Sequence, residues 1–243
     1  MRLQYLSDVH LEFHRDHGLA FADSVEPVAE TLVLAGDVAP MGDLSYIEPI
    51  RALCQKFARV LYVAGNHEFY GAHVKAATAN IRALPSAVPN LHILEPGTLV
   101  ILDGQRFVGG TLWFADGPGN RRYARLMNDF TAIRGFVPWV YQQHLAMREA
   151  FDLYLEPGDV VVTHHLPSPM SVGHQYLGSN LNRFFVTNLE ALMLERHPAI
   201  WIHGHGHTSA RYRIGATRVA ANPLGYVGYE ENAAFDPRSV IET

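Results

Sequence analysis

The stretch Val60 to Glu68, VLYVAGNHE, decides the fold class of this 243-residue chain. An apolar run of strand length stops there at a glycine and three polar residues, and such near-continuous hydrophobicity is typical of a strand covered on both faces. Four other stretches share this form: Leu3 to His10 (LQYLSDVH), Thr31 to Val38 (TLVLAGDV), Val160 to His165 (VVVTHH) and Ala199 to His207 (AIWIHGHGH). Together they predict a buried, largely parallel sheet.

Helices are expected between these strands because apolar residues recur there at helical spacing. The segments are residues 44–57, 74–84, 141–155 and 187–196. Alternation of strands and helices predicts an α/β architecture. Residues 91–112 are expected to form a meander of three short strands, and residues 209–221 a hairpin, because turn-forming pairs interrupt both. Both segments would add antiparallel strands and make the sheets mixed.

Composition narrows the class of protein. With 48% hydrophobic and 18% charged residues, the chain is globular rather than disordered or collagen-like, and no repeat or linker divides it, so residues 1–243 are expected to form a single domain. The net charge of -5 disfavours long nucleic acid as a partner. The one cysteine, Cys54, cannot form an intramolecular disulfide, and neither a membrane span nor a signal-peptide core is evident. We therefore expect a cytoplasmic protein that does not bind membranes.

Polar residues stand where each predicted strand ends. Ligands of open α/β sheets bind outside the carboxyl ends of the strands. The residues placed there are Asp8, His10, Asp37, Asn66, His67, His164, His165, His205 and His207. Three of these ends contain a glycine directly before the polar residue, namely Gly36, Gly65 and Gly204, and a residue without Cβ permits a sharp exit from a strand.

The donor types at these ends indicate metal binding. The chain has 14 histidines and one cysteine, so a metal site must use imidazole and oxygen. Asp8 and His10 are two residues apart and point to one side of an extended strand end, as do His205 and His207. The full set over-supplies a single ion, whereas two ions sharing one carboxylate would keep positions open for water and substrate. The donors suit Mn, Fe, Zn, Co or Ni better than Ca or Mg.

The ordered motifs resemble those of the calcineurin-like metallophosphoesterase superfamily. They are D-x-H at Asp8 and His10, G-D at Gly36-Asp37, G-N-H-E at Gly65 to Glu68, the histidine ending VVVTHH, and G-H-x-H at Gly204 to His207. This resemblance implies a four-layer α/β/β/α sandwich of two mixed sheets with flanking helices, and two divalent or trivalent metal ions, most readily Mn, Fe or Zn. Glu68 stands where many members have aspartate, at a position that is not a ligand.

The same resemblance implies the ligand sets. Asp8, His10, Asp37 and His207 would hold metal one. Asp37, Asn66, His164 and His205 would hold metal two, with Asp37 bridging. A bridging hydroxide would attack phosphorus in line.

His67 is not needed as a ligand, and its place beside Asn66 makes it a candidate general acid at the leaving-group oxygen. Asp37 or Glu68 would orient its ring. His165 is either a substrate contact or a structural residue. Arg122, in the cluster Arg121 to Arg125, either grips a phosphorylated substrate or lies on a solvated helix face. Residues 114–140 are expected to form a cap or substrate loop.

The sequence thus predicts a metal-dependent hydrolase of small phosphodiesters or phosphomonoesters. A nuclease acting on single-stranded nucleic acid and a non-catalytic metal-binding scaffold on the same fold are the alternatives. A metalloprotease is not predicted, because H-E-x-x-H is absent at His67-Glu68. The metal motifs carry no information on the substrate's organic part or on the oligomeric state.

Overall fold

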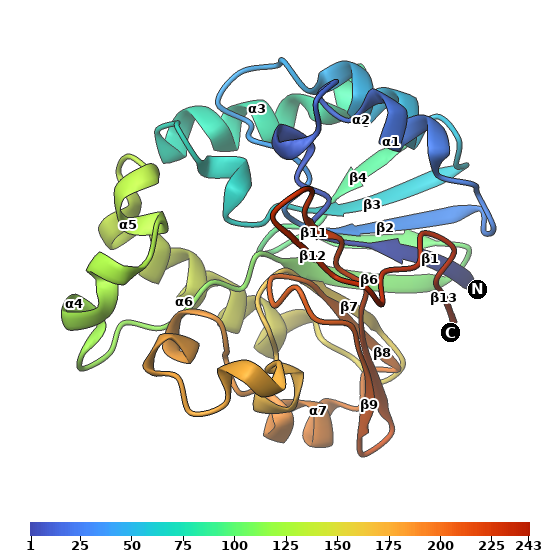
Figure 1. Cartoon of the computed structure of the whole chain (residues 1–243). Helices are drawn as coiled ribbons and strands as arrows, with labels where there is room; N and C mark the ends of the chain where they lie inside the picture. The colour runs from blue at the N-terminus through green and yellow to red at the C-terminus, as the bar shows by residue number, and fades with distance from the viewer.

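A computed structural model describes all 243 residues and contains two large mixed sheets (Figure 1). The first has the order β13-β1-β2-β3-β4, in which β1 to β4 run parallel and β13 pairs antiparallel with β1. Its strands are β1 (Arg2–Leu6), β2 (Thr31–Ala35), β3 (Arg59–Val63), β4 (Leu91–Ile93) and β13 (Val240–Glu242).

The second sheet has the order β5-β6-β7-β8-β10-β9. Its four central strands are parallel, and β5 and β9 pair antiparallel with β6 and β10 at the two edges. The strands are β5 (Leu99–Leu102), β6 (Gln105–Gly110), β7 (Val160–Thr163), β8 (Ile200–His203), β9 (Ala210–Ile214) and β10 (Thr217–Ala221). The predicted mixed α/β fold and the C-terminal hairpin are confirmed.

The predicted meander over residues 91–112 is wrong in one strand. β4 pairs parallel with β3 in the first sheet, whereas β5 and β6 form a hairpin in the second. The chain crosses between the sheets at Pro96-Gly97, a pair that the meander would use as a simple hairpin turn. Turn chemistry marks where a chain bends, but it does not tell which sheet the next strand joins.

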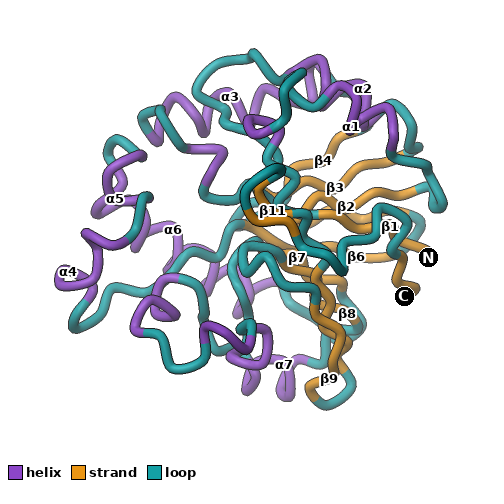
Figure 2. The backbone as a smooth tube through the Cα atoms, in the orientation of Figure 1, coloured by secondary structure: helices purple, strands orange, loops and turns teal.

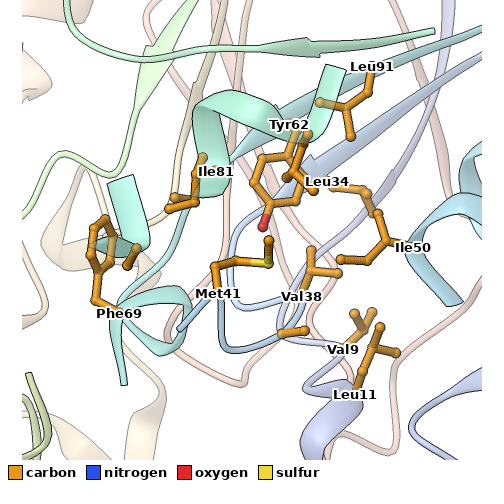
Figure 3. Close-up of a cluster of buried hydrophobic side chains, with 14 of the residues drawn as sticks. Val9, Leu11, Leu34, Val38, Met41, Ile50, Tyr62, Phe69, Ile81 and Leu91 are labelled. Atoms are coloured by element: carbon orange, nitrogen blue, oxygen red, sulfur yellow. The ribbon is translucent and has the colours of Figure 1, made fainter. Parts of the chain in front are cut away.

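Helices cover the outer face of each sheet, which gives four layers. Leu34, Ile50, Tyr62 and Ile81 belong to the core between the first sheet and its helices. Phe151, Met193 and Trp201 belong to the corresponding core behind the second sheet. The longer helices are α1 (Leu19–Ser24), α2 (Ile47–Cys54), α3 (Val74–Ala87), α6 (Phe136–Tyr154) and α7 (Glu190–Arg196). The four helical segments expected from the sequence are therefore present, and Figure 3 shows part of the first core.

A third hydrophobic core lies between the two sheets. The first sheet contributes Tyr5, Val33 and Leu61, and the second contributes Val160 and Ile200. The strands are thus covered on both faces, as their continuous hydrophobicity predicts. Because β1, β2, β3, β7 and β8 run parallel to their neighbours within each sheet, the loops that follow them gather at one edge of the sandwich (Figure 2).

Two further segments border that edge. One contains the short helices α4 (Asn120–Tyr123), η3 (Ala124–Leu126) and α5 (Asp129–Ala132), within the range expected to form a cap. The other is a small hairpin of β11 (Gly225–Tyr226) and β12 (Glu230–Glu231), which lies in front of the strand ends in Figure 1. Backbone hydrogen bonds from Leu224 and Gly225 to Ser7 and Asp8 fix this hairpin beside the end of β1.

The remaining single-turn helices are η1 (Leu11–Phe13), η2 (His67–Phe69), η4 (Pro169–Ser171), η5 (His174–Tyr176) and η6 (Asn180–Phe184). Each follows a strand end or lines the loops near it, which places irregular backbone around the gathered polar residues. None of the helices has both the length and the hydrophobicity that a membrane-spanning helix requires.

Leu61→Ala should destabilise the protein strongly. Leu61 is fully buried between the sheets, so truncation leaves a cavity that rigid strands cannot close, and the expected loss in free energy of unfolding is about 2–5 kcal/mol. Urea denaturation measures this loss. Leu153→Ala, on an α6 side chain that is 66% exposed, is the control and should change stability far less. Equal losses in the two variants would contradict the proposed inter-sheet core.

Candidate active site

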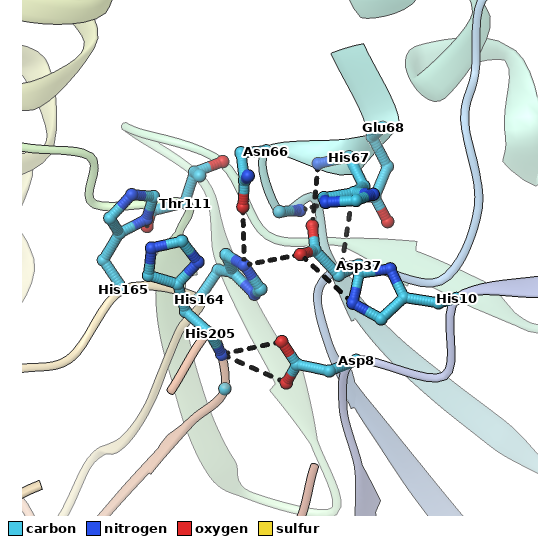
Figure 4. Close-up of polar contacts among 12 residues, drawn as sticks. Asp8, His10, Asp37, Asn66, His67, Glu68, Thr111, His164, His165 and His205 are labelled. Atoms are coloured by element: carbon cyan, nitrogen blue, oxygen red, sulfur yellow. Dashed lines mark hydrogen bonds and ion pairs between the residues drawn. The ribbon is translucent and has the colours of Figure 1, made fainter. Parts of the chain in front are cut away.

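The polar strand ends form two of the three groups of potential metal ligands in the structure (Figure 4). Asp8, His10 and His207 form one group, and Asp37, His164 and His205 form the other. Within each group the ligand atoms lie within 4.8 Å of one another. All of these residues are buried except His207, which is partly exposed. The third group is His10, Glu12 and His67, in which Glu12 lies outside the strand ends.

In the first group, imidazole nitrogens and carboxylate oxygens lie close together. The Nε2 atoms of His10 and His207 are 3.2 Å apart, and His207 Nε2 lies 3.5 Å from Asp8 Oδ1. His10 Nε2 is 3.7 Å from Asp37 Oδ2, which connects this group to the second. Imidazole nitrogens and carboxylate oxygens gathered in this way are potential ligands of a divalent cation.

The second group consists of Asp37, His164 and His205, with Asn66 beside it. His164 Nε2 lies 3.2 Å from Asp37 Oδ2 and 3.1 Å from Asn66 Oδ1. His205 Nε2 is buried and has no hydrogen-bond partner. A buried nitrogen without a partner is destabilising in a metal-free protein but suits a metal ligand. Asp37 Oδ2 is thus shared between the two groups, as a bridging carboxylate would be.

The ring orientations are fixed from the far side. His164 Nδ1 lies 2.9 Å from the carbonyl of Ala35, and His10 Nδ1 lies 3.2 Å from Glu12 Oε1. An Nδ1–H that donates to oxygen leaves Nε2 as an acceptor directed at the centre. The ring of His205 is held by stacking between His165 and Phe185, with ring centroids 4.2 and 4.3 Å away.

The backbone is strained at the ligands. Five of these residues have left-handed backbone dihedrals: Asp8, His10, Asp37, His205 and His207. Non-glycine residues rarely adopt this conformation, which is unfavourable by roughly 1–2 kcal/mol each. Such a concentration of strain at one edge of a sheet is typical of a functional site.

Gly36, Gly65 and Gly204 are required for steric reasons as well as for the sharp turn at the end of each strand. Only Gly36 has a positive φ, of 90°. A Cβ on Gly36 would lie 2.4 Å from His164 Nδ1, one on Gly65 would lie 2.1 Å from Asp37 Oδ1, and one on Gly204 would lie 2.5 Å from Asp8 Oδ2. Each glycine therefore makes room for a candidate ligand that comes from another strand.

Comparison with known proteins agrees with this geometry. The sequence model of the calcineurin-like phosphoesterase family matches residues 1–209. The chain belongs to this family. It is a phosphoester hydrolase, and the family implies divalent metal ions, for which the His and Asp clusters are the candidate sites.

The relatives of this phosphoesterase are distant in sequence. An uncharacterized protein of Acanthamoeba polyphaga mimivirus is 24% identical over 274 aligned positions, covering 99% of this chain and 96% of that protein. A phosphopantetheinyl hydrolase from Mycobacterium tuberculosis superposes with a TM-score of 0.70 at 18% identity, covering 92% of this chain and 89% of that chain. A protein of Thermus thermophilus superposes with a TM-score of 0.56 at 17% identity, covering 92% of this chain and 88% of that chain. These structures show the shared fold.

A carboxylate that was not predicted from the sequence orients His67 in this phosphoesterase. Glu12 Oε1 lies 2.8 Å from His67 Nδ1, and the Tyr226 hydroxyl lies 3.2 Å from His67 Nε2. Asp37 instead accepts the backbone N–H of His67, so the expectation that Asp37 or Glu68 orients the ring is wrong. Glu12 lies two residues after His10, the last residue of the D-x-H motif. This proximity is the one sequence feature that places Glu12 near the site.

Glu68 has a structural task. Its carboxylate accepts backbone N–H groups from Gly65, Asp37 and Val38 and the hydroxyl of Tyr62, at 2.7–3.1 Å. Burial, with the neighbouring Asp37 carboxylate, raises the pKa of Glu68 to about 7. These bonds hold the loops after β2 and β3 together.

Asn66 is oriented by a residue of the cap segment. Its Nδ2 donates to Asp129 Oδ1 at 3.0 Å, and the Tyr70 hydroxyl donates to the same oxygen at 2.6 Å. With its amide nitrogen thus engaged, Asn66 directs Oδ1 toward His164 and the second group. Asp129 comes from a distant segment, and nothing in its local sequence signals this contact.

Opposing effects set the charges of the acidic and basic groups. Burial lowers the pKa of His67, but the carboxylates of Asp37 and Glu12 outweigh burial, so the pKa is raised. Burial likewise disfavours the Asp37 carboxylate, but His164 and His67 hold its pKa well below its usual range. Burial and the neighbouring His164 lower the pKa of His165 to about 3, which keeps that ring neutral.

The structure places the two predicted substrate residues away from the open space. A cavity of about 300 Å3 adjoins Asp37, Asn66 and His205, and neither His165 nor Arg122 lines it. His165 is fully buried, with Nδ1 bonded to the carbonyl of Thr111 and its ring behind His205. Arg122 is exposed, with its guanidinium over the ring of Tyr123. Residues 126–129, within the range expected to form a cap, line the cavity.

Gly65→Ala should reduce metal content. The added Cβ would clash with Asp37 Oδ1 and with the backbone nitrogen of Asp37, neither of which can yield without moving the shared carboxylate. Displacing a group that holds a metal site typically weakens metal affinity about 10–100-fold. Elemental analysis after dialysis against limiting metal measures the loss. Gly117→Ala, where a Cβ meets nothing closer than 3.9 Å, should retain wild-type metal content. Full loading of both variants would contradict the packing argument.

Glu12→Gln should lower turnover. The amide removes the negative charge that faces His67 Nδ1 while keeping the side chain's size, so kcat should fall about tenfold or more with little change in KM. Steady-state kinetics at saturating metal, with metal content measured in parallel, separate positioning of His67 from loss of metal through His10. Glu48→Gln, on the exposed surface of α2, is the matched control. An unchanged kcat in Glu12→Gln would exclude the positioning role.

Proposed function

We propose that the protein hydrolyses small phosphodiesters or phosphomonoesters at a dinuclear metal centre formed by the two groups. Asp8, His10, Asp37 and His207 would hold metal one. Asn66, His164 and His205 would hold metal two together with Asp37. The observation that carries the proposal is the convergence of these side chains, from five strand ends, on two clusters that share Asp37 Oδ2.

The donor set fits such ions. Each cluster combines imidazole nitrogen with carboxylate oxygen, a mixture that suits Mn, Fe or Zn. His205 Nε2 is buried without a partner, so a cation would satisfy a group that the protein leaves unsatisfied. The Nε2 atoms of His10 and His207 lie 3.2 Å apart, close enough to serve as ligands of one ion. No cysteine belongs to either group, so the candidate metals are those that imidazole and carboxylate ligands bind.

The chemistry divides between the ions and the chain. When bound, the two cations lower the pKa of a water molecule and balance the negative charge on the phosphoryl oxygens. The candidate ligands, from Asp8 to His207, would hold these cations, which would supply a hydroxide as the nucleophile toward phosphorus. His67, with Nδ1 held by Glu12, would give a proton from Nε2 to the departing ester oxygen. The Tyr226 hydroxyl lies 3.2 Å from this Nε2.

One alternative is another enzyme activity, and a second belongs to a non-catalytic class. A nuclease acting on single-stranded nucleic acid would use the same metal chemistry on a longer substrate. A non-catalytic metal-binding scaffold would keep the ligands without turnover, and the family assignment disfavours it. We place the protein in the cytoplasm as an expectation that rests on its single cysteine, Cys54, and on its composition.

Reconstitution tests the proposal. Metal-stripped protein should be inactive and should regain hydrolysis of p-nitrophenyl phosphate or bis-p-nitrophenyl phosphate with Mn, Fe, Zn or Co. A panel that also contains cyclic nucleotides and single-stranded DNA separates the nuclease from the small-ester hydrolase. A protein that binds two metals and leaves every ester intact would support the scaffold instead.

The variant His67→Ala tests whether His67 is the general acid. Without the imidazole, turnover should fall about 10²–10⁴-fold, the usual contribution of a positioned acid, while metal content stays at the wild-type level. His14→Ala, at a histidine outside both clusters, is the control for loss of an imidazole. Loss of metal in His67→Ala would show that His67 is a ligand and would refute its role as acid.

A further inference from the structure

The cavity beside the second group of candidate ligands has largely apolar walls. Besides the candidate ligands it is lined by apolar side chains, among them Met127, Leu166, Val172, Leu181 and Phe185. We call this space the arm cavity. It lies between the cap and the loops of η4 to η6, and its volume of about 300 Å3 is at the small end of ligand pockets.

No lysine or arginine lines the arm cavity. Beyond the candidate ligands, its only charged side chains are the carboxylates of Asp129 and Glu230. Glu230 accepts a hydrogen bond from the Tyr176 hydroxyl at the rim. The nearby cation Arg183 is turned away, because it donates to the carbonyls of Asn180 and Pro118 and lies over the ring of Tyr123.

Neutral hydrogen-bonding groups interrupt the apolar walls. Asn128, Ser179 and Asn182 line the arm cavity. The Asn128 side chain makes no hydrogen bond within the protein and is exposed, so its amide is free to pair with a ligand. Asn182 uses Nδ2 on the carbonyl of Tyr176, which leaves its Oδ1 as an acceptor. Few polar groups on an apolar wall typically fix the orientation of a ligand.

We infer that the substrate carries a single phosphate and an uncharged, partly apolar arm, with amide or hydroxyl groups, that enters the arm cavity. The inference rests on the proposed function, since it assumes that the phosphate binds at the metal groups. A second phosphate or carboxylate at the far end of the arm would meet the carboxylates of Asp129 and Glu230 with no lysine or arginine to balance it. Nucleoside polyphosphates and the repeating phosphates of single-stranded nucleic acid are therefore disfavoured.

Two isosteric esters test the charge of the arm. ω-Carbamoylpentyl p-nitrophenyl phosphate and ω-carboxypentyl p-nitrophenyl phosphate differ only in an amide or a carboxylate at the end of the arm, and methyl p-nitrophenyl phosphate has no such arm. The metal-loaded wild-type protein should favour the carbamoyl arm over the carboxyl arm by about fivefold or more in kcat/KM, because like charges about 4 Å apart repel by about 1 kcal/mol even in water. Calorimetric Kd values for the matching non-hydrolysable phosphonates should show the same preference.

Asn128→Lys should shift this preference. It adds a cation to the wall of the arm cavity and should reduce the ratio of carbamoyl to carboxyl kcat/KM about fivefold or more, by the same Coulombic argument. Asn180→Lys adds the same charge to η6 at an exposed residue that does not line the arm cavity, and should leave the ratio unchanged. Circular dichroism confirms that both variants are folded.

The outcomes separate the inference from the proposed function. Hydrolysis of both arms at equal kcat/KM, or equal shifts in the two lysine variants, would overturn the inference and leave the phosphoesterase mechanism intact. Absence of hydrolysis of all three esters, with the arm preference retained in the phosphonate Kd values, would overturn the proposed function and support the inference about the cavity.

Discussion

A single buried carboxylate holds the site together. Glu68 accepts backbone N–H groups from the loops after both β2 and β3, including those of Gly65 and Asp37. These loops carry Asp37, Asn66 and His67, so the position of the shared carboxylate and of the candidate acid depends on this one side chain. Aspartate, which many family members have at this position, is one methylene shorter. Here the longer side chain also reaches the hydroxyl of Tyr62 within the outer core.

The arrangement of the candidate ligands is energetically unfavourable in the metal-free protein. Five candidate ligands sit in left-handed backbone conformations, and His205 Nε2 is buried without a partner. The folded sheets on either side determine this arrangement, because the inter-sheet core fixes the strand ends from which the ligands emerge. Metal binding would stabilise a geometry that the apolar core has already imposed, so binding and folding should be thermodynamically linked.

Features that depend on a single local signal could be predicted from the sequence. Continuous hydrophobicity identified the buried strands, and the polar residues at their ends identified the candidate cluster before any geometry was known. Local signals failed where position in space decided the outcome. Pro96-Gly97 marks a crossing between sheets rather than a turn within one, and Gly65 and Gly204 are needed because ligands from other strands occupy the space of a Cβ. Glu12 was missed because it is distant from His67 in the chain, and only the fold brings the two side chains together.

The contacts that no motif predicted come from segments outside the five strand ends. Asp129 reaches Asn66 from the cap, and Tyr226 reaches His67 from a hairpin that lies beyond residue 209, where the family match ends. The cap and the C-terminal segment also contribute Asn128 and Glu230 to the arm cavity. The contacts around the candidate ligands thus come both from within the matched range, as with Asp129, and from beyond it, as with Tyr226. We infer that the choice of substrate depends on the segment of α4 to α5 and on the C-terminal hairpin, which line the arm cavity, because a shared fold does not by itself determine the substrate.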